Sequence, residues 1–230
     1  MEQQNNEKIV ISLGGSLIVP GEVDINFLKN FRKLILSQIE KGKKFVIITG
    51  GGKLARKYND VAKEITDIST EDLDWIGIGS TRLNARLVRA IFGDLALKEI
   101  VLNPDIIPET DKPVILGGGF KPGNSSDLAA IHSAMSIGAK KVINLSNIDY
   151  VYTEDPKKNP NAQKIEKMTW EECRKLLPES WDPGLNAPFD PVAAKKAEEN
   201  NIEVAIMNGN NLENLEQYLD GGDFDGTIIN

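Results

Sequence analysis

The chain has 230 residues, of which 40% are hydrophobic and 27% are charged, so it is long enough to bury a sizeable core. Its 27 Lys and Arg against 34 Asp and Glu give a formal net charge of −7, which disfavours nucleic acid as the main partner. One cysteine, Cys173, and one histidine, His132, exclude an internal disulfide and disfavour metal or nucleophile sites built from these residues.

Neither a targeting signal nor a membrane span is evident. Residues 1–7 are polar and acidic, so we expect an N-terminal extension rather than a signal peptide. Apolar runs stay well short of the roughly 18 residues that cross a bilayer. We therefore expect a soluble, cytoplasmic protein without a membrane partner.

Short apolar segments rich in β-branched residues predict buried strands, and periodic segments between them predict helices. The strands are expected at 8–13, 44–49, 114–116, 140–145 and 202–207. The helices are expected at about 24–42, 53–65, 74–92, 126–137, 170–177 and 191–200.

This alternation predicts an α/β fold, a three-layer α/β/α sandwich around a mainly parallel sheet. No linker divides the chain, so residues 8–230 are expected to form a single domain. Residues 154–187, richer in Pro, Lys, Asn and Trp, are expected to form a subdomain or lid-like loops.

Glycine clusters end three of the predicted strands, at residues 14–15, 50–52 and 117–119. Ligands of an open parallel sheet bind beyond the carboxyl ends of its strands, where glycine lets backbone N–H groups approach an anion. The helix that follows each turn favours a phosphate at its N-terminus, and Lys53 and Arg56 add positive charge. The clusters therefore predict a nucleotide site, although they match neither the P-loop nor the G-x-G-x-x-G pattern.

Two aspartates stand at predicted helix starts near these turns, Asp127 after the third cluster and Asp190 after Pro188. Phosphoryl transfer uses Mg²⁺ and cationic side chains to neutralise charge, with little acid–base chemistry from the protein. Asp127, Asp190 and Lys53 are therefore the catalytic candidates, with helix capping as the alternative role of the aspartates. No cluster of residues with metal-ligand spacing is predicted.

Seven motifs in order resemble the amino acid kinase superfamily and, within it, the archaeal-type uridylate (UMP) kinases. They lie at 9–17, 49–58, 74–84, 118–127, 146–156, 190–195 and 226–229. The resemblance implies one amino acid kinase domain, with an acceptor-binding half at about 8–145 and an ATP-binding half at about 146–230. It also implies transfer of the γ-phosphate of ATP to UMP with Mg²⁺, giving UDP and ADP for pyrimidine nucleotide synthesis. By analogy alone, the resemblance implies a homo-oligomer, with the hexamer as the form known in the family.

Site residues are implied at the positions that match the family motifs. Positions implied to bind ATP are Gly15, Ser16, Gly52, Arg56, Ser146, Asn147, Tyr152 and Asp155. Positions implied to bind UMP are Gly51, Asp74 for the ribose, and the loop Phe120, Lys121, Pro122, Gly123, Asn124, Ser125 and Ser126.

Departures from the family pattern keep alternatives open. Ser12 stands where bacterial members have Lys, so another cation, among Lys53, Lys121 and Lys195, must serve the transferred phosphate. Phe120 and Lys121 alter the acceptor loop, and Tyr150 replaces a usual glycine. The alternatives are a non-catalytic nucleotide-binding protein, like the molybdenum storage proteins of the superfamily, or a kinase of another small phosphate or carboxylate.

Overall fold

A seven-stranded sheet forms the centre of the computed structural model, which describes residues 7–178 and 187–230. The strand order is β3-β2-β1-β4-β8-β9-β7, and all pairs are parallel except β8 with β9. The strands are β1 (Lys8–Leu13), β2 (Lys44–Thr49), β3 (Val114–Gly117), β4 (Lys141–Ser146), β7 (Lys167–Met168), β8 (Glu203–Asn208) and β9 (Thr227–Ile229). A separate antiparallel pair joins β5 (Val151–Tyr152) to β6 (Lys164–Ile165).

The strand order reverses between β1 and β4. The chain adds β2 and β3 on one side of β1 and then returns to place β4 on the other side. Such a switch point leaves a crevice at the carboxyl ends of the two central strands, where ligands of doubly wound sheets bind. The parallel register of β1 with β4 pairs Ser12 with Asn144 next to this crevice.

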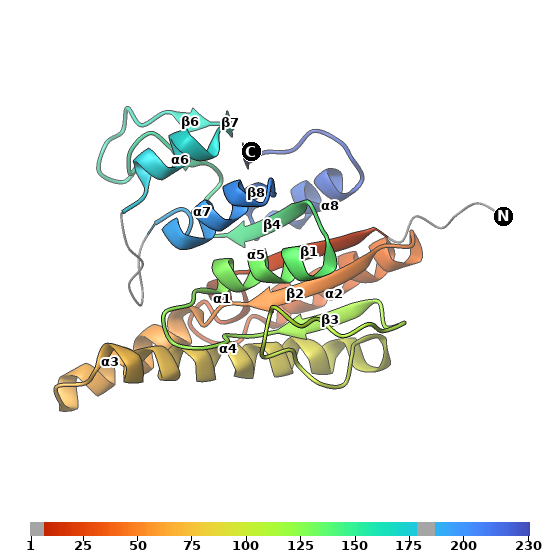
Figure 1. The fold of residues 1–230 in the computed structure, drawn as a ribbon, viewed down its shortest axis with the longest axis horizontal. Coiled ribbons are helices and arrows are strands. Elements are labelled where there is room, and N and C mark those ends of the chain that lie inside the picture. The colour runs from red at the N-terminus through yellow and green to blue at the C-terminus, as the bar shows by residue number, and fades with distance from the viewer. Residues whose placement is uncertain (1–6, 179–186) are drawn as a thin grey trace.

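Helices cover both faces of the sheet (Figure 1). The helical segments are α1 (Gly15–Ile18), α2 (Ile25–Glu40), α3 (Gly52–Ile65), α4 (Thr70–Phe92), the 3₁₀ turn η1 (Gly93–Leu95), α5 (Ser126–Ile137), α6 (Trp170–Leu176), α7 (Pro191–Glu199) and α8 (Leu212–Leu219). Because side chains of a strand alternate between faces, Ile9, Ile11 and Leu13 of β1 pack against α1, α2, α4 and α8. Val10 faces the second core, which α5, α6 and α7 cover.

These two cores confirm the predicted three-layer sandwich around a mainly parallel sheet. The predicted strands agree with the structure to within one residue at each end, and α4 begins four residues earlier than expected, at Thr70. The elements α1, α8, β5, β6, β7 and β9 were not predicted. Residues 154–187 contain β6, β7 and α6, while positions 1–6 and 179–186 of the predicted extension and lid lie outside the described residues.

Helix α3 projects from the body of the molecule alongside α4 (Figure 1) and contains no fully buried residue. Helix α2, by contrast, uses Phe27, Phe31 and Ile35 in the core, and Asp24 caps its start by accepting a hydrogen bond from the Phe27 N–H. Core packing therefore accounts for the amphipathic pattern of α2.

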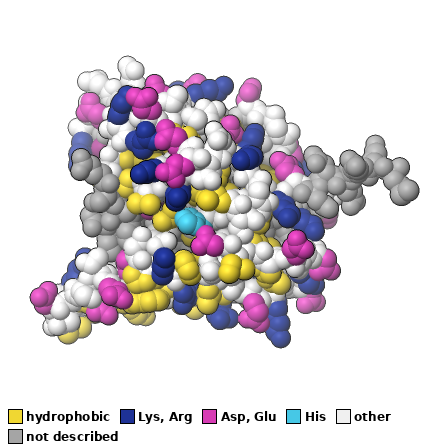
Figure 2. Space-filling model, viewed as in Figure 1, with side chains coloured by type: hydrophobic (Ala, Val, Ile, Leu, Met, Phe, Trp, Pro, Cys, Tyr) yellow, Lys and Arg dark blue, Asp and Glu magenta, His cyan; other side chains and the backbone are white. Residues whose placement is uncertain are grey.

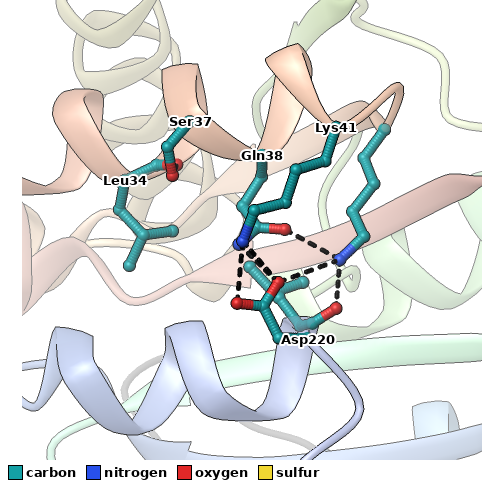
Figure 3. Close-up of polar contacts among 7 residues, drawn as sticks. Leu34, Ser37, Gln38, Lys41 and Asp220 are labelled. Atoms are coloured by element: carbon teal, nitrogen blue, oxygen red, sulfur yellow. Dashed lines mark hydrogen bonds and ion pairs between the residues drawn. The ribbon is translucent and has the colours of Figure 1, made fainter.

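A polar cluster fastens the end of α8 to the end of α2 (Figure 3). The carboxylate of Asp220 accepts hydrogen bonds from Lys41 Nζ at 2.7 Å and from Gln38 Nε2 at 3.0 Å. Lys43, whose side chain is largely buried, donates to Gln38 Oε1 and to the Leu219 carbonyl. Among all the described helices, none has the length and apolar character to span a bilayer.

Candidate active site

A cavity of about 240 Å³ opens at the carboxyl edge of the sheet, between the α3–α4 pair and the start of α5. Segments distant in sequence meet there, including two of the three glycine turns and both candidate aspartates. It is lined by Gly51, Gly52, Ala55, Arg56, Asn59, Leu73, Asp74, Gly77, Ile78, Thr81, Gly119, Asn124, Ser125, Ser126, Asp127, Ala187, Phe189 and Asp190.

The first two glycine turns pack backbone against backbone. A Cβ on Gly15 would lie 2.3 Å from the Gly50 oxygen, and one on Gly52 would lie 2.3 Å from the Gly15 carbonyl carbon. Gly52 also has a φ of +62°, which L side chains rarely adopt. Arg56 Nη2 donates to Ser16 Oγ at 3.0 Å, so Ser16 and Arg56 connect the two turns by a side-chain contact as well.

Helix α4 fixes the turns through hydrogen bonds to their backbones. Asn84 Nδ2 donates to the Gly50 carbonyl at 2.8 Å. The guanidinium of Arg82 donates to the carbonyls of Gly119 and Phe120, and the Gly119 N–H donates to Thr81 Oγ1 at 2.6 Å. One helix thus holds the turn after β2 and the loop after β3 at a fixed separation.

Asp74 lies in the second turn of α4 and is 8% exposed. Its Oδ2 accepts a hydrogen bond of 2.7 Å from the Gly123 N–H, which ties the loop after β3 to the helix. Burial raises the pKa of Asp74, and the hydrogen bond from Gly123 partly opposes this. The cavity therefore has a carboxylate with a fixed position on one wall.

Asp127 lies at the switch point between β1 and β4. Its Oδ1 accepts hydrogen bonds from Ser12 Oγ at 3.0 Å and from Asn144 Nδ2 at 2.8 Å. Burial and the charge of Asp190 together raise the pKa of Asp127 to about 6. Ser125, rather than Asp127, caps α5 by accepting from the Leu128 N–H, so helix capping does not account for Asp127.

Asp190 does cap a helix, because its Oδ1 accepts from the N–H groups of Val192 and Ala193 at 2.6 and 2.9 Å. Its other oxygen, Oδ2, is buried without a hydrogen-bond partner in the described residues. An unpaired buried carboxylate oxygen is costly unless a ligand or ion completes it. Asp190 therefore both caps α7 and lines the cavity.

The candidate cations are distributed unevenly around the cavity. Among the described residues, Arg56 is the cation that lines it. Lys53 and Lys195 are exposed on α3 and α7, and Lys121 Nζ lies 5.3 Å from the centre of the Phe120 ring. Phe120, Lys121, Pro122 and Gly123 belong to the loop between β3 and α5 but do not line the cavity.

The residues implied to hold the ATP nucleoside lie apart from this cavity. Ser146 ends β4, Asn147 follows it, Tyr152 is half-buried on β5, and Asp155 Oδ1 accepts from the Lys157 N–H in a turn. Tyr150, expected beside the nucleotide, is buried, and its hydroxyl donates to Asp225 Oδ1 at 2.7 Å. No described contact joins this group to the cavity, and its role in binding stays a prediction.

Several site residues were absent from the sequence-based site candidates, namely Asn59, Thr81, Asn84 and Asn144, and Ser12 was noted only as a departure from the family pattern. A polar residue inside an otherwise apolar strand was a usable signal for Ser12 and Asn144. Asn59 follows Arg56 by three residues, a spacing that places both on one face of α3. His132, on α5, is the single cyan side chain in Figure 2. Its Nδ1 lies 2.5 Å from Asp105 Oδ1, and the residue does not line the cavity.

The known proteins that this chain resembles agree with one another. Residues 7–208 match the model of the amino acid kinase family. A uridylate kinase of Thermococcus kodakarensis is 32% identical over 96% of this chain and 99% of its own. A uridylate kinase of Methanoculleus marisnigri is 33% identical over 97% of this chain and 95% of its own.

Solved structures agree with this result. The uridylate kinase of Archaeoglobus fulgidus superposes with a TM-score of 0.81 at 31% identity, covering 97% of this chain and 100% of that one. The likeness of fold is thus accompanied by sequence identity along nearly the whole chain. The chain belongs to the amino acid kinase family.

Proposed function

We propose that the protein is a uridylate kinase, which transfers the γ-phosphoryl group of ATP to UMP and releases UDP and ADP. The observation that carries the proposal is the cavity itself, where Arg56, Asp74, Asp127 and the second and third glycine turns meet. The relatives that are 31–33% identical over nearly the whole chain are named uridylate kinases, which supports the same reaction.

The acceptor occupies the side of the cavity formed by α4 and the loop after β3. Asp74 binds the ribose hydroxyls of UMP, because a fixed carboxylate can accept both hydrogen bonds. Ser125 and Ser126 lie at the N-terminus of α5, where hydroxyls and free N–H groups suit the UMP phosphate. Gly51 lines the same side of the cavity and packs closely on α3, since a Cβ there would lie 2.8 Å from Ala55 Cβ.

The donor phosphates lie over the first two glycine turns. Backbone N–H groups near Gly15 and Gly52, the N-terminus of α3 and the guanidinium of Arg56 offer positive potential to them. The ATP nucleoside then extends toward Ser146, Asn147, Tyr152 and Asp155. In this arrangement residues of about 8–145 bind the acceptor and the ATP phosphates, and residues of about 146–230 bind the ATP nucleoside.

The residues fit a Mg²⁺ ion that accompanies the ATP phosphates. Mg²⁺ prefers carboxylate oxygens and keeps several waters or phosphate oxygens. Asp190 has a buried oxygen without a partner, and Asp127 carries a second carboxylate whose charge is destabilised by Asp190. Asp127 and Asp190 would therefore hold the ion, whose contribution is to neutralise charge on the transferring group.

The protein's own groups act mainly by positioning. The attacking oxygen of the UMP phosphate is already ionised near neutral pH, so no general base is required. It forms a bond to the γ-phosphorus of ATP while the bond from that phosphorus to the ADP oxygen breaks. Arg56 and the α5 N-terminus stabilise charge on the transferred group, and the α4 anchors keep the two phosphates aligned.

The test is formation of ADP and UDP from ATP and UMP, followed by chromatography, with CMP and no acceptor as parallel reactions. Rapid UDP formation that depends on UMP is expected. Binding of ATP without turnover on any acceptor would overturn the proposal and favour a storage protein. Faster turnover with a different phosphate or carboxylate would reassign the acceptor.

We also propose that the protein forms a homo-oligomer through α3 and α4. Ile65 and Tyr58 of α3 are 78% and 60% exposed, and Leu83 of α4 is 60% exposed. Figure 2 shows hydrophobic side chains at the surface along α4. Sedimentation velocity should give an oligomer that Ile65→Lys weakens, and a monomeric wild type would contradict this.

A further inference from the structure

Asn59 lines the cavity without a role in the contacts described so far. It lies on α3, one turn beyond Arg56, and its Oδ1 is buried with no hydrogen-bond partner in the described residues. Buried polar atoms in folded proteins are almost always paired, so an unpaired one inside a ligand cavity points to the ligand. The side chain is therefore available for a molecule that fills the cavity.

The packing of α3 on α4 puts Asn59 across from Asp74. A Cβ on Gly51 would contact both Ala55 and the Gly77 carbonyl, so the start of α3 lies against the middle of α4. Asn59 comes one turn after Ala55, and Asp74 comes one turn before Gly77, which brings both to the same side of the helix pair. Both line the same cavity.

The hydrogen-bond groups of UMP leave one choice for the Asn59 oxygen. UMP has three neutral donors, namely the two ribose hydroxyls and the N3–H of uracil. Asp74 accepts from the hydroxyls in the proposed function, so N3–H remains for a further acceptor. A carboxamide has an oxygen that accepts and an NH₂ that donates side by side, which complements N3–H and the neighbouring O4 of uracil.

We propose that Asn59 recognises the imide edge of uracil, with Oδ1 accepting from N3–H and Nδ2 donating to O4. This proposal rests on the proposed function, since it names the part of UMP, the uracil base, that the same cavity would recognise. Asn59 is a specificity-determining residue and takes no part in the phosphoryl transfer. Its amide torsion is soft, which lets the oxygen turn toward the bound base.

The experiment combines a protein change with a substrate change. Asn59→Leu keeps the side-chain size and removes both polar atoms, and the 5′-monophosphate of 3-methyluridine lacks the N3–H donor. The wild type should show at least a tenfold lower kcat/KM for the methylated acceptor than for UMP. Asn59→Leu should raise the KM for UMP about tenfold, leave the KM for ATP within twofold, and lose most of the discrimination against the methylated acceptor.

Controls separate this result from misfolding and from failure of the proposed reaction. Asn30→Leu makes the same exchange at an exposed position of α2 and should match the wild type. Equal discrimination by the wild type and Asn59→Leu would overturn the role of Asn59 while the kinase activity stands. An Asn59→Leu protein that has lost ATP binding or its thermal transition would be replaced by Asn59→Ser, judged by the same ratio. A wild type that does not phosphorylate UMP at all would overturn the proposed function itself.

Discussion

Ser12 of β1 and Asn144 of β4 lie opposite each other in the parallel register, and both donate a hydrogen bond to the same oxygen of Asp127. The two central strands at the switch point therefore hold a carboxylate from α5 at the edge of the cavity. Both donors are neutral, so they orient Asp127 without cancelling its charge. The cavity thus keeps net negative charge beside Asp190, which is useful where a cation must bind with the phosphates.

Asp127→Asn should stabilise the ligand-free protein and abolish turnover. The amide oxygen can still accept from Ser12 and Asn144, while the repulsion from Asp190 disappears. In EDTA at pH 7.5 we expect thermal unfolding about 2–4 °C above the wild type, the shift for about 1 kcal/mol in a protein of this size. Calorimetry measures the shift, and a lower unfolding temperature for the variant would contradict the assigned repulsion.

Arg56→Ala should reduce kcat about 10²–10³-fold, because a cation aimed at the transferring phosphate acts most strongly in the transition state. The change also breaks the contact between Arg56 and Ser16 that joins the first two glycine turns. The matched control is Lys57→Ala, which removes an exposed cation from the next position of α3. Steady-state kinetics with Mg²⁺, ATP and UMP measure both variants, and similar losses in the two would show a general charge effect instead.

Asp74→Ala should raise the KM for UMP about 10–100-fold and that for ATP little, since a hydrogen-bonding carboxylate on the ribose is removed. Asp74 also accepts from the Gly123 N–H, so part of the loss reflects the loop. Asp74→Asn separates the two effects, because the amide oxygen can still hold Gly123. If KM rose equally for both nucleotides, Asp74 would not belong to the acceptor site.

Asp220→Asn should lower the thermal unfolding temperature by about 1–3 °C at pH 7, as expected for a partly exposed ion pair. Hydrogen bonds from Lys41 and Gln38 hold the pKa of Asp220 below its ordinary value. A depressed carboxyl pKa stabilises the fold above the unfolded-state pKa, and this stabilisation is lost as pH falls through the folded-state pKa.

The difference between Asp220→Asn and the wild type should therefore shrink as the pH falls below about 4, the usual pKa of a carboxyl group. Unfolding curves recorded between pH 7 and pH 3 measure it. Glu22→Gln, at an exposed position before α2, is the matched control. A difference that stays constant down to pH 3 would mean that the Asp220 charge does not contribute.

The sequence predicts the long elements and the glycine turns because their signals are local. Buried parallel strands such as β1 and β2 are continuous apolar runs, and clustered glycines end them. The short β9 is a run of three β-branched residues, too short to predict a strand by itself, and its position depends on pairing with β8. The helix α1 is four residues long and begins in a glycine cluster, so propensity argues against it.

The candidate site likewise contains residues that the sequence predicts and residues that it does not. Gly51, Gly52, Arg56, Asp74 and Asp127 were expected from motifs, and the structure brings them into one cavity. Asn59 and the α4 anchors Thr81, Arg82 and Asn84 were not among the expected residues, because their importance depends on which helix faces which loop. The proximity of Asp127 and Asp190 likewise depends on the tertiary structure, because the sequence shows only two aspartates at separate helix starts.

The anchors on α4 contact backbone atoms of the loops and not their side chains. Thr81, Arg82 and Asn84 bond to the main chain of Gly119, Phe120 and Gly50, and Asp74 bonds to the main chain of Gly123. These hydrogen bonds therefore do not depend on the loop side chains, although Gly119 must stay small because a Cβ there would lie 2.9 Å from Thr81 Oγ1. Side chains such as Phe120 and Lys121 can therefore be exchanged without loss of the hydrogen bonds that hold the loop beside the acceptor.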